Sequence, residues 1–204
     1  MERGKSSSTP LAPHLKLSRA NCPKFDAKKA EMAKVPYASK CGSLMYAMIA
    51  TRLDIAFAMR VVDRFMSNPS KKHWEAVKGV LQYLAGTKDK CIRFGKGKLS
   101  VVGYTDADFA RDLDRRRSIS DYLYTFAGGA ISWFSQLQSC VTLSTTEAKY
   151  VAVLESCKEA IWLTYSVGDL GNSSVALGDS IRETHIVLAI CGQREKGEAF
   201  QVLE

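Results

Sequence analysis

The spacing of apolar residues changes near residue 90, and this change limits the chain to folds that combine a helical part with a sheet. Before residue 90, apolar residues recur at three- and four-residue steps, as they do along one face of a helix. After it, they follow the two-residue alternation of strands. We therefore predict a helical segment over residues 35–88 and an α/β domain over residues 89–204, and a chain of 204 residues is long enough for both.

Three helices forming a compact bundle are expected in the helical segment, the first over residues 44–49 and the second over residues 55–66. The third has the clearest limits, because Asn68 can cap it, Pro69 can occupy its first position and Gly86 can end it. Its apolar stripe, which either packs in the core or binds a partner, consists of Trp74, Val77, Leu81 and Leu84.

Strand-like segments open the α/β domain. They are residues 90–95, 99–107, 121–129 and 130–136, with a hairpin turn at Gly128 and Gly129. A helix is then expected from about Thr145 to Asp169, and its apolar side consists of Tyr150, Val153, Leu154, Cys157 and Ile161. After about residue 171 the pattern degenerates, with short strands expected at 175–177 and 185–190. Antiparallel strands, a helix and further strands imply a mixed α/β sheet.

Residues 1–34 contain three prolines, many Ser and Lys, and no apolar periodicity, so we expect a basic, extended or disordered linker. Residues 1–40 hold nine Lys or Arg against three acids, and the whole chain has a formal net charge of +8. Such a basic arm suits nucleic acid, although basic linkers also occur without that role.

No stretch is long and apolar enough to span a bilayer, and the first residues lack the apolar core of a signal peptide. We therefore expect a cytoplasmic or nuclear protein without a membrane partner. The six cysteines are scattered and form no Cys-x-x-Cys pair, which favours free thiols over a zinc site or a disulfide framework.

The run YTDAD places Asp106 and Asp108 near the end of a predicted strand. A carboxylate within an apolar strand is costly unless it is paired or binds a metal. Mg²⁺ prefers hard oxygen ligands, usually contributed by several elements of the fold. The two aspartates are therefore candidate metal ligands, and a turn-forming or capping pair is the alternative.

Several segments in fixed order resemble the C-terminal part of the Pol polyprotein of copia-type LTR retrotransposons, where the reverse transcriptase ends and ribonuclease H follows. They are GSLMYAMIATRLDIAFA, RFMSNPSKKHWEAVKGVLQYLAGT, GYTDADFA, RRRSISDYLYTFAGGAISWFSQLQ and LSTTEAKY. The resemblance runs from about Ser8 to Gly171 and implies a ribonuclease H-like mixed sheet with helices. It also implies cleavage of the RNA strand of an RNA–DNA hybrid by two Mg²⁺ ions, with no small-molecule substrate.

The resemblance implies four metal-binding acids, of which the first corresponds to Asp106. The second is, in the family, the last Glu of a Thr-Glu-Ala-Glu-Tyr run, and TEAKY has Lys149 there. The run ALGDS makes Asp179 a candidate third acid. Val187 stands where the closing His-Ile-Asp segment of the family has its acid, with His185 at the His. The catalytic site is therefore expected to be degenerate.

Further departures from the family pattern also indicate a degenerate domain. Arg111 and Asp121 stand where glycine is usual, so the loop or the hairpin is expected to be strained, and Leu53 stands where proline is usual. Between Ser180 and His185 there is no room for the helix that the family has there. We therefore expect a domain that is truncated at its C-terminus.

Glu147 could replace the missing second acid, but two residues along a helix amount to about 200° of rotation. Ser144 and Glu147 instead have the spacing of a capping box. Lys149 would bring a positive charge to a cation site, where two unit charges about 4 Å apart repel by about 4 kcal/mol at an effective dielectric of about 20. Mg²⁺ binding is therefore expected to be weakened.

We therefore expect a truncated Pol fragment whose ribonuclease H-like domain is inactive but can still bind an RNA–DNA hybrid or other nucleic acid. Arg115, Arg116 and Arg117 are the candidate phosphate contacts, with a solvated loop as the alternative. A second hypothesis is an active nuclease with a rearranged site, formed by Asp106, Asp108, Glu147 and Asp179. A third is a non-enzymatic interaction protein such as a secreted RxLR-type effector of a plant pathogen, although no Arg-x-Leu-Arg run is present.

Overall fold

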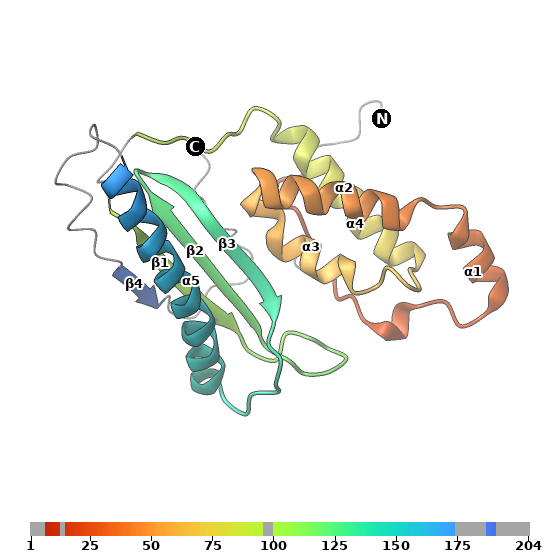
Figure 1. Ribbon diagram of the computed structural model, residues 1–204. Helices are drawn as coiled ribbons and strands as arrows, with labels where there is room; N and C mark the ends of the chain where they lie inside the picture. Colours follow the sequence, from red (N-terminus) through yellow and green to blue (C-terminus); the bar gives the residue numbers. More distant parts are fainter. Residues whose placement is uncertain (1–6, 13–14, 96–99, 174–186, 191–204) are drawn as a thin grey trace. The chain divides into compact units, whose positions relative to one another are not determined.

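The structure is a computed structural model that describes residues 7–12, 15–95, 100–173 and 187–190. These residues form two compact units, a helical unit up to Cys91 and a sheet unit from Ile92 onward (Figure 1). No helix within this described part of the chain combines the length and the apolarity needed to cross a membrane.

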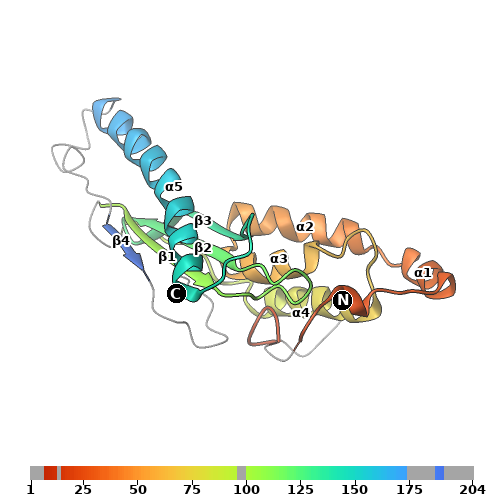
Figure 2. The same cartoon turned by 90° about the horizontal axis from the view of Figure 1, so that it is seen from below.

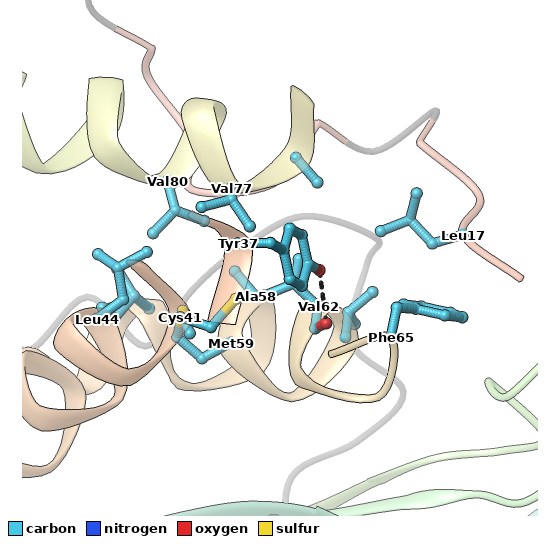
Figure 3. Close-up of a cluster of buried hydrophobic side chains, with 13 residues drawn as sticks. Leu17, Tyr37, Cys41, Leu44, Ala58, Met59, Val62, Phe65, Val77 and Val80 are labelled. Carbon is cyan, nitrogen blue, oxygen red and sulfur yellow. Dashed lines mark hydrogen bonds between the residues drawn. The ribbon is translucent and has the colours of Figure 1, made fainter. Parts of the chain in front are cut away.

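The helical unit contains four described α-helices, and all but the first contribute to one apolar core. They are α1 (Asp26–Ala33), α2 (Tyr37–Ala50), α3 (Ala56–Asp63) and α4 (Lys71–Gly86), with the short 3-10 turns η1 (Arg19–Asn21) and η2 (Leu53–Ile55). Helices α2, α3 and α4 contribute most of the buried cluster shown in Figure 3, which confirms the predicted bundle. Within it, the Tyr37 hydroxyl donates a 2.7 Å hydrogen bond to the Val62 carbonyl.

The expectation of an extended segment over residues 1–34 is wrong for α1, which lies inside it. The sequence DAKKAEMA of α1 consists largely of good helix formers and lacks glycine and proline, so a helix forms there without burying a side chain. Further toward the N-terminus, Leu17 is only 4% exposed and belongs to the core of the helical unit.

Helix α4 begins two positions after the predicted start. Ser70, not Asn68, is the cap: its hydroxyl accepts the backbone N–H of His73, while the His73 ring accepts the backbone N–H of Ser70 at 3.0 Å. Asn68 instead donates its side-chain amide to the Pro23 carbonyl. The apolar stripe is also rotated from the predicted one, because the fully buried His73 stacks on Phe65 at 3.9 Å between ring centres. The predicted end at Gly86 is confirmed.

A buried ion pair joins η2 to the end of α4. Arg52 binds both carboxylate oxygens of Asp54, at 2.9 and 2.7 Å, and also donates to the hydroxyl and the carbonyl of Thr87. The Tyr83 hydroxyl donates to the same carboxylate at 2.7 Å. Burial, together with the Asp54 carboxylate, raises the pKa of Tyr83 to about 12. The charges of Arg52 and Asp54 are therefore compensated inside the unit.

The sheet unit contains four described strands in the order β3–β2–β1–β4. They are β1 (Val102–Asp108), β2 (Ile119–Phe126), β3 (Gly129–Leu137) and β4 (Val187–Ile190). Strands β1, β2 and β3 are antiparallel neighbours, whereas β4 runs parallel to β1. Helix α5 (Thr145–Ser173) lies across one face of the sheet over β1 and β2 (Figures 1 and 2). The predicted mixed α/β class is confirmed.

Some predicted strand limits differ from the structure. Residues 90–95 form no regular strand and make a single backbone bond to the sheet unit's hairpin turn, from Gly95 N–H to the Ala127 carbonyl. That turn is centred on Ala127 and Gly128, both with positive φ, rather than on Gly128 and Gly129. Paired positive φ values match the right-handed twist of the flanking strands. The expected strand at 175–177 lies outside the described residues.

The buried side of α5 is not the predicted apolar side. The side chains that face the sheet include Ala148, Ala152, Ser156, Leu163 and Val167, all buried. Most of the residues expected on the apolar side are exposed instead, among them Tyr150, Leu154 and Ile161. The small residues on the buried side let the helix approach the sheet, where Tyr124 fills the space between them.

Tyr124 of β2 contacts both β1 and α5 at the centre of the sheet unit. Its ring covers Gly103 of β1, where any Cβ would overlap it. Its hydroxyl donates to the Ser156 carbonyl of α5 at 2.7 Å and lies 2.8 Å from the Ser156 hydroxyl. The side chain is fully buried, so these bonds do not compete with water.

Replacing Tyr124 by phenylalanine should lower the free energy of unfolding of the sheet unit by about 1.5 kcal/mol, because buried Ser156 loses its hydrogen-bond partner. Urea unfolding monitored by circular dichroism measures the change. The matched control is Tyr165→Phe on α5, where the side chain is 72% exposed and the same deletion should cost less than about 0.5 kcal/mol. Equal losses in both variants would contradict this account.

Candidate functional site

Asp106 lies near the C-terminal end of β1, in the middle of the sheet, and is 7% exposed. One carboxylate oxygen accepts the backbone N–H of Ala107 at 2.8 Å. Side chains alternate along a strand, and Gly103 faces Tyr124 on the α5 side, so Asp106 lies on the opposite face of the sheet. The structure therefore holds a buried carboxylate at the position of the first predicted acid.

Asp121 of β2 is the register partner of Asp106 in the antiparallel β1–β2 pair. Directly opposed residues have Cβ atoms about 5 Å apart and point to the same face, so two carboxylates lie side by side. In the sequence, Asp121 is notable only as a residue that stands where glycine is usual. The signal that could have found it was the hairpin register, which places the two aspartates opposite each other.

Asp108, the second predicted metal ligand, is exposed at the end of β1. Its carboxylate forms an ion pair of 3.4 Å with the guanidinium of Arg111. No group of three or more Asp, Glu, His or Cys side chains suited to a metal occurs among the described residues. The donor set that these residues offer therefore does not fit a two-metal centre, and the metal-binding roles of Asp106 and Asp108 stay predictions.

Lys149 lies in the second turn of α5 and is half-buried, between buried Ala148 and exposed Tyr150. It is thus at the edge of the contact between the helix and the sheet. No ion pair links its ammonium group to Asp106 within the part of the chain that the structure describes. Where the resemblance expects a carboxylate, the helix therefore presents a cation that supplies no ligand.

Glu147 has the predicted capping role. The Ser144 hydroxyl accepts the backbone N–H of Glu147 at 3.1 Å, and the Glu147 carboxylate accepts the backbone N–H of Leu143 at 2.7 Å. The one difference from a standard capping box is that the carboxylate reaches the residue before the cap. Glu147 is exposed on the side of α5 that points away from the sheet, so it does not replace the missing acid.

The connection between β1 and β2 is a closed loop that presents the predicted basic residues. Asp112 N–H bonds to the Arg117 carbonyl at 3.0 Å, and Arg116 N–H bonds to the Asp112 carbonyl at 2.8 Å. The Asp112 carboxylate is buried and accepts the backbone N–H of Asp114. Arg115 and Arg116 are exposed at the tip, whereas Arg117 is half-buried.

The backbone strain expected at Arg111 and Asp121 occurs at other residues instead. Asp121 sits in a regular part of β2, paired with Asp106 on one side and Ser135 on the other. Positive φ values occur instead at Ala110, with 50°, and at Arg116, with 57°. Each costs on the order of 1 kcal/mol for a residue with a Cβ.

The remaining predicted acids do not complete the site. Asp179 and His185 lie outside the described residues. Val187 opens β4 and pairs with Val102 at the start of β1, whereas Asp106 lies toward the other end of that strand. The parallel strand beside β1 is therefore formed by the segment that the resemblance assigned to the closing motif.

Comparisons with known proteins support similarity to the Pol polyproteins of transposons. The chain is 57% identical over 171 residues to the retrovirus-related Pol polyprotein from transposon TNT 1-94 of Nicotiana tabacum, and this match covers 84% of the chain. It is 36% identical over 172 residues to the Pol polyprotein from transposon RE1 of Arabidopsis thaliana. It spans 13% and 11% of the lengths of these two relatives.

A third relative is matched over most of its own length. Secreted RxLR effector protein 161 of Plasmopara viticola is 46% identical over 134 residues, which are 65% of this chain and 94% of that protein. No protein-family model and no solved structure matches the chain. The chain is a member of a class of transposon-derived sequences. It belongs to the family of retrovirus-related Pol polyproteins from transposons, as a segment of one.

Replacing Asp106 by asparagine should raise the free energy of unfolding at neutral pH by about 0.5 kcal/mol, because it removes one of two directly opposed negative charges. Urea unfolding at pH 7 measures the gain. In Asp108→Asn, the same change two residues along β1 breaks the exposed ion pair with Arg111 and should lower stability slightly or leave it unchanged. A loss of stability in Asp106→Asn would show that the pair carries a favourable interaction.

Proposed function

We propose that the chain combines the end of a reverse transcriptase with a ribonuclease H-like domain of a copia-type retrotransposon, and that this domain binds RNA–DNA hybrids without cutting them. The observation that carries the proposal is Lys149, a cation at the edge of the helix–sheet contact where the resemblance expects a metal-binding carboxylate. The helical unit corresponds to the reverse transcriptase part.

The arrangement of the sheet unit supports a ribonuclease H-like fold. Three antiparallel strands are followed along the chain by α5 and then by a strand parallel to the first. The first strand is central and carries the buried Asp106 near its C-terminal end. The resemblance predicts antiparallel strands followed by a helix, with the first acid on the first strand, whereas the strand parallel to β1 comes from the closing segment.

The oxygen ligands that the described residues could offer to Mg²⁺ support the proposed loss of catalysis. In the proposed ancestral reaction, Mg²⁺ would stabilise the attacking water and the leaving oxygen. Asp106 is the described residue that would hold it, and its neighbour Asp121 comes from the adjacent strand. Lys149 adds a positive charge instead of an oxygen ligand, and Asp108 is engaged with Arg111.

Binding to a hybrid would rest on phosphate contacts, which need no metal. Arg115 and Arg116 stand exposed at the tip of a loop that is closed by backbone hydrogen bonds. Such a loop holds its side chains in place without a ligand, and the chain as a whole carries a formal charge of +8. A purely solvated loop is the alternative that the experiments below distinguish.

Restoring the second acid should recover metal binding. The native chain should not cleave a labelled RNA–DNA hybrid in Mg²⁺ or Mn²⁺, whereas Lys149→Glu should bind Mn²⁺ at least about tenfold more tightly in calorimetric titration, since a cation is exchanged for a ligand. The control is Lys158→Glu, the same charge change at an exposed lysine of α5, which should leave Mn²⁺ affinity unchanged. Metal-dependent cutting by the native chain that disappears in Asp106→Asn would overturn the proposed inactivity.

Removing the two loop arginines should weaken binding to the hybrid. The variant Arg115→Gln/Arg116→Gln should reduce the slope of log K against log salt by about 2, because two phosphate contacts are lost. Fluorescence anisotropy with a labelled hybrid at several salt concentrations measures this slope. The control Lys71→Gln/Lys72→Gln removes equal charge from exposed residues of α4. If both variants change the slope equally, the loop is not a specific contact.

A second candidate function follows from the match that covers 94% of Secreted RxLR effector protein 161. In this alternative the chain is a non-enzymatic protein that acts by binding another protein. One measurement distinguishes the two candidate functions. Saturable binding of the purified chain to an RNA–DNA hybrid favours the first, in which the ribonuclease H-like domain binds hybrids. Absence of hybrid binding, together with a defined protein ligand, favours the second.

A further inference from the structure

The outward face of α5 carries a row of large apolar side chains that nothing in the described structure covers. They are Tyr150, Leu154, Ile161 and Tyr165, which are 73%, 62%, 59% and 72% exposed. The sheet-facing side of the same helix holds the small buried residues Ala148, Ala152 and Ser156. The helix is therefore apolar on the side that faces away from its own sheet, which is typical of an interaction surface.

These four residues form one stripe. At 100° per residue they lie within about 60° of one another around the helix. A stripe of this width matches the contact strip between two packed helices. Trp162, which is 61% exposed, lies on its flank and widens the apolar surface.

The spacing of the stripe is symmetric along the chain. Tyr150 and Leu154 are separated by four residues, Leu154 and Ile161 by seven, and Ile161 and Tyr165 by four, so aromatic residues stand at both ends and aliphatic ones inside. An identical helix running antiparallel, with its two-fold axis between Cys157 and Lys158, places each tyrosine opposite a tyrosine. It also places Leu154 opposite Ile161. The stripe is therefore complementary to itself.

We propose that the outward face of α5 is the contact surface of a homodimer, in which two copies of α5 pack antiparallel about a two-fold axis near Cys157. The occupant of the stripe is a second copy of this chain.

Two charged residues lie beside the stripe near the proposed two-fold axis. Glu155 and Lys158 form an ion pair of 3.3 Å on its flank, close to the axis. The two-fold operation brings the two Lys158 side chains to the same side of the axis, and the Glu155 partner of each lysine compensates its charge. No charged residue interrupts the stripe between Tyr150 and Tyr165.

The size of the stripe indicates a weak dimer. A large aromatic side chain offers about 150–250 Å² for burial, so the five exposed residues provide roughly 600 Å² per copy. A standard stable interface buries about 800 Å² per partner. We therefore expect reversible association with a dissociation constant in the micromolar range.

The test is sedimentation equilibrium of the full chain over a range of micromolar concentrations. The native chain should show a concentration-dependent monomer–dimer equilibrium. Leu154→Lys and Ile161→Glu should each weaken association at least tenfold, because each introduces a charge opposite an apolar residue. The double variant Leu154→Lys/Ile161→Glu should recover most of the affinity, since the antiparallel register brings the new lysine of one copy opposite the new glutamate of the other.

The control is Leu143→Glu, which removes an exposed leucine just before α5 and outside the stripe. Its dimerisation should equal that of the native chain, and circular dichroism should show unchanged folding in all variants. A monomer at every concentration overturns the proposal, whether another segment of the chain or a different protein covers the stripe. A dimer that both single variants leave intact also overturns it. Failure of the double variant to recover affinity overturns the antiparallel register.

Discussion

The contact of Tyr124 with Gly103 and Ser156 determines how the sheet unit is assembled. The ring occupies the space that a side chain on β1 would need, and the hydroxyl reaches the backbone of α5 at 2.7 Å. Small residues in the first half of α5 allow this approach, so Ala148, Ala152 and Ser156 face the sheet while Tyr150 and Leu154 face outward. Two features follow from that one orientation: Lys149 lies at the edge of the helix–sheet contact, and the stripe from Tyr150 to Tyr165 faces outward.

On the other face of the sheet, the strand register has an electrostatic consequence. It places Asp106 opposite Asp121, a pair that one metal ion could neutralise and that repels without one. On the α5 side, Lys149 stands where the resemblance expects the second carboxylate, and Arg111 pairs with Asp108 at the end of β1. The charged groups around Asp106 therefore differ from those that the resemblance expects. This difference is the basis of the proposed loss of catalysis.

The helical unit depends on a different kind of contact. Its core is apolar and is linked by the Tyr37–Val62 hydrogen bond, while a buried Arg52–Asp54 pair ties η2 to the end of α4. Local sequence predicted α2, α3 and α4, because 3.6-residue periodicity is strong there, but it missed α1. It misplaced the α4 cap, because two residues that can cap stand close together and the choice depends on His73, whose ring is held against Phe65.

The sequence by itself determined the mixed α/β class, the Ser144–Glu147 cap and the membership in the Pol polyprotein family, because periodicity, capping and ordered motifs are local properties of the chain. Only the tertiary structure decided which side of α5 is buried and which carboxylate lies beside Asp106. Both depend on contacts between residues far apart in the chain. Apolar content alone favoured the side with Tyr150, Leu154 and Ile161, whereas the side that packs on the sheet is small near Ser156 and carries Leu163 and Val167 further along the helix.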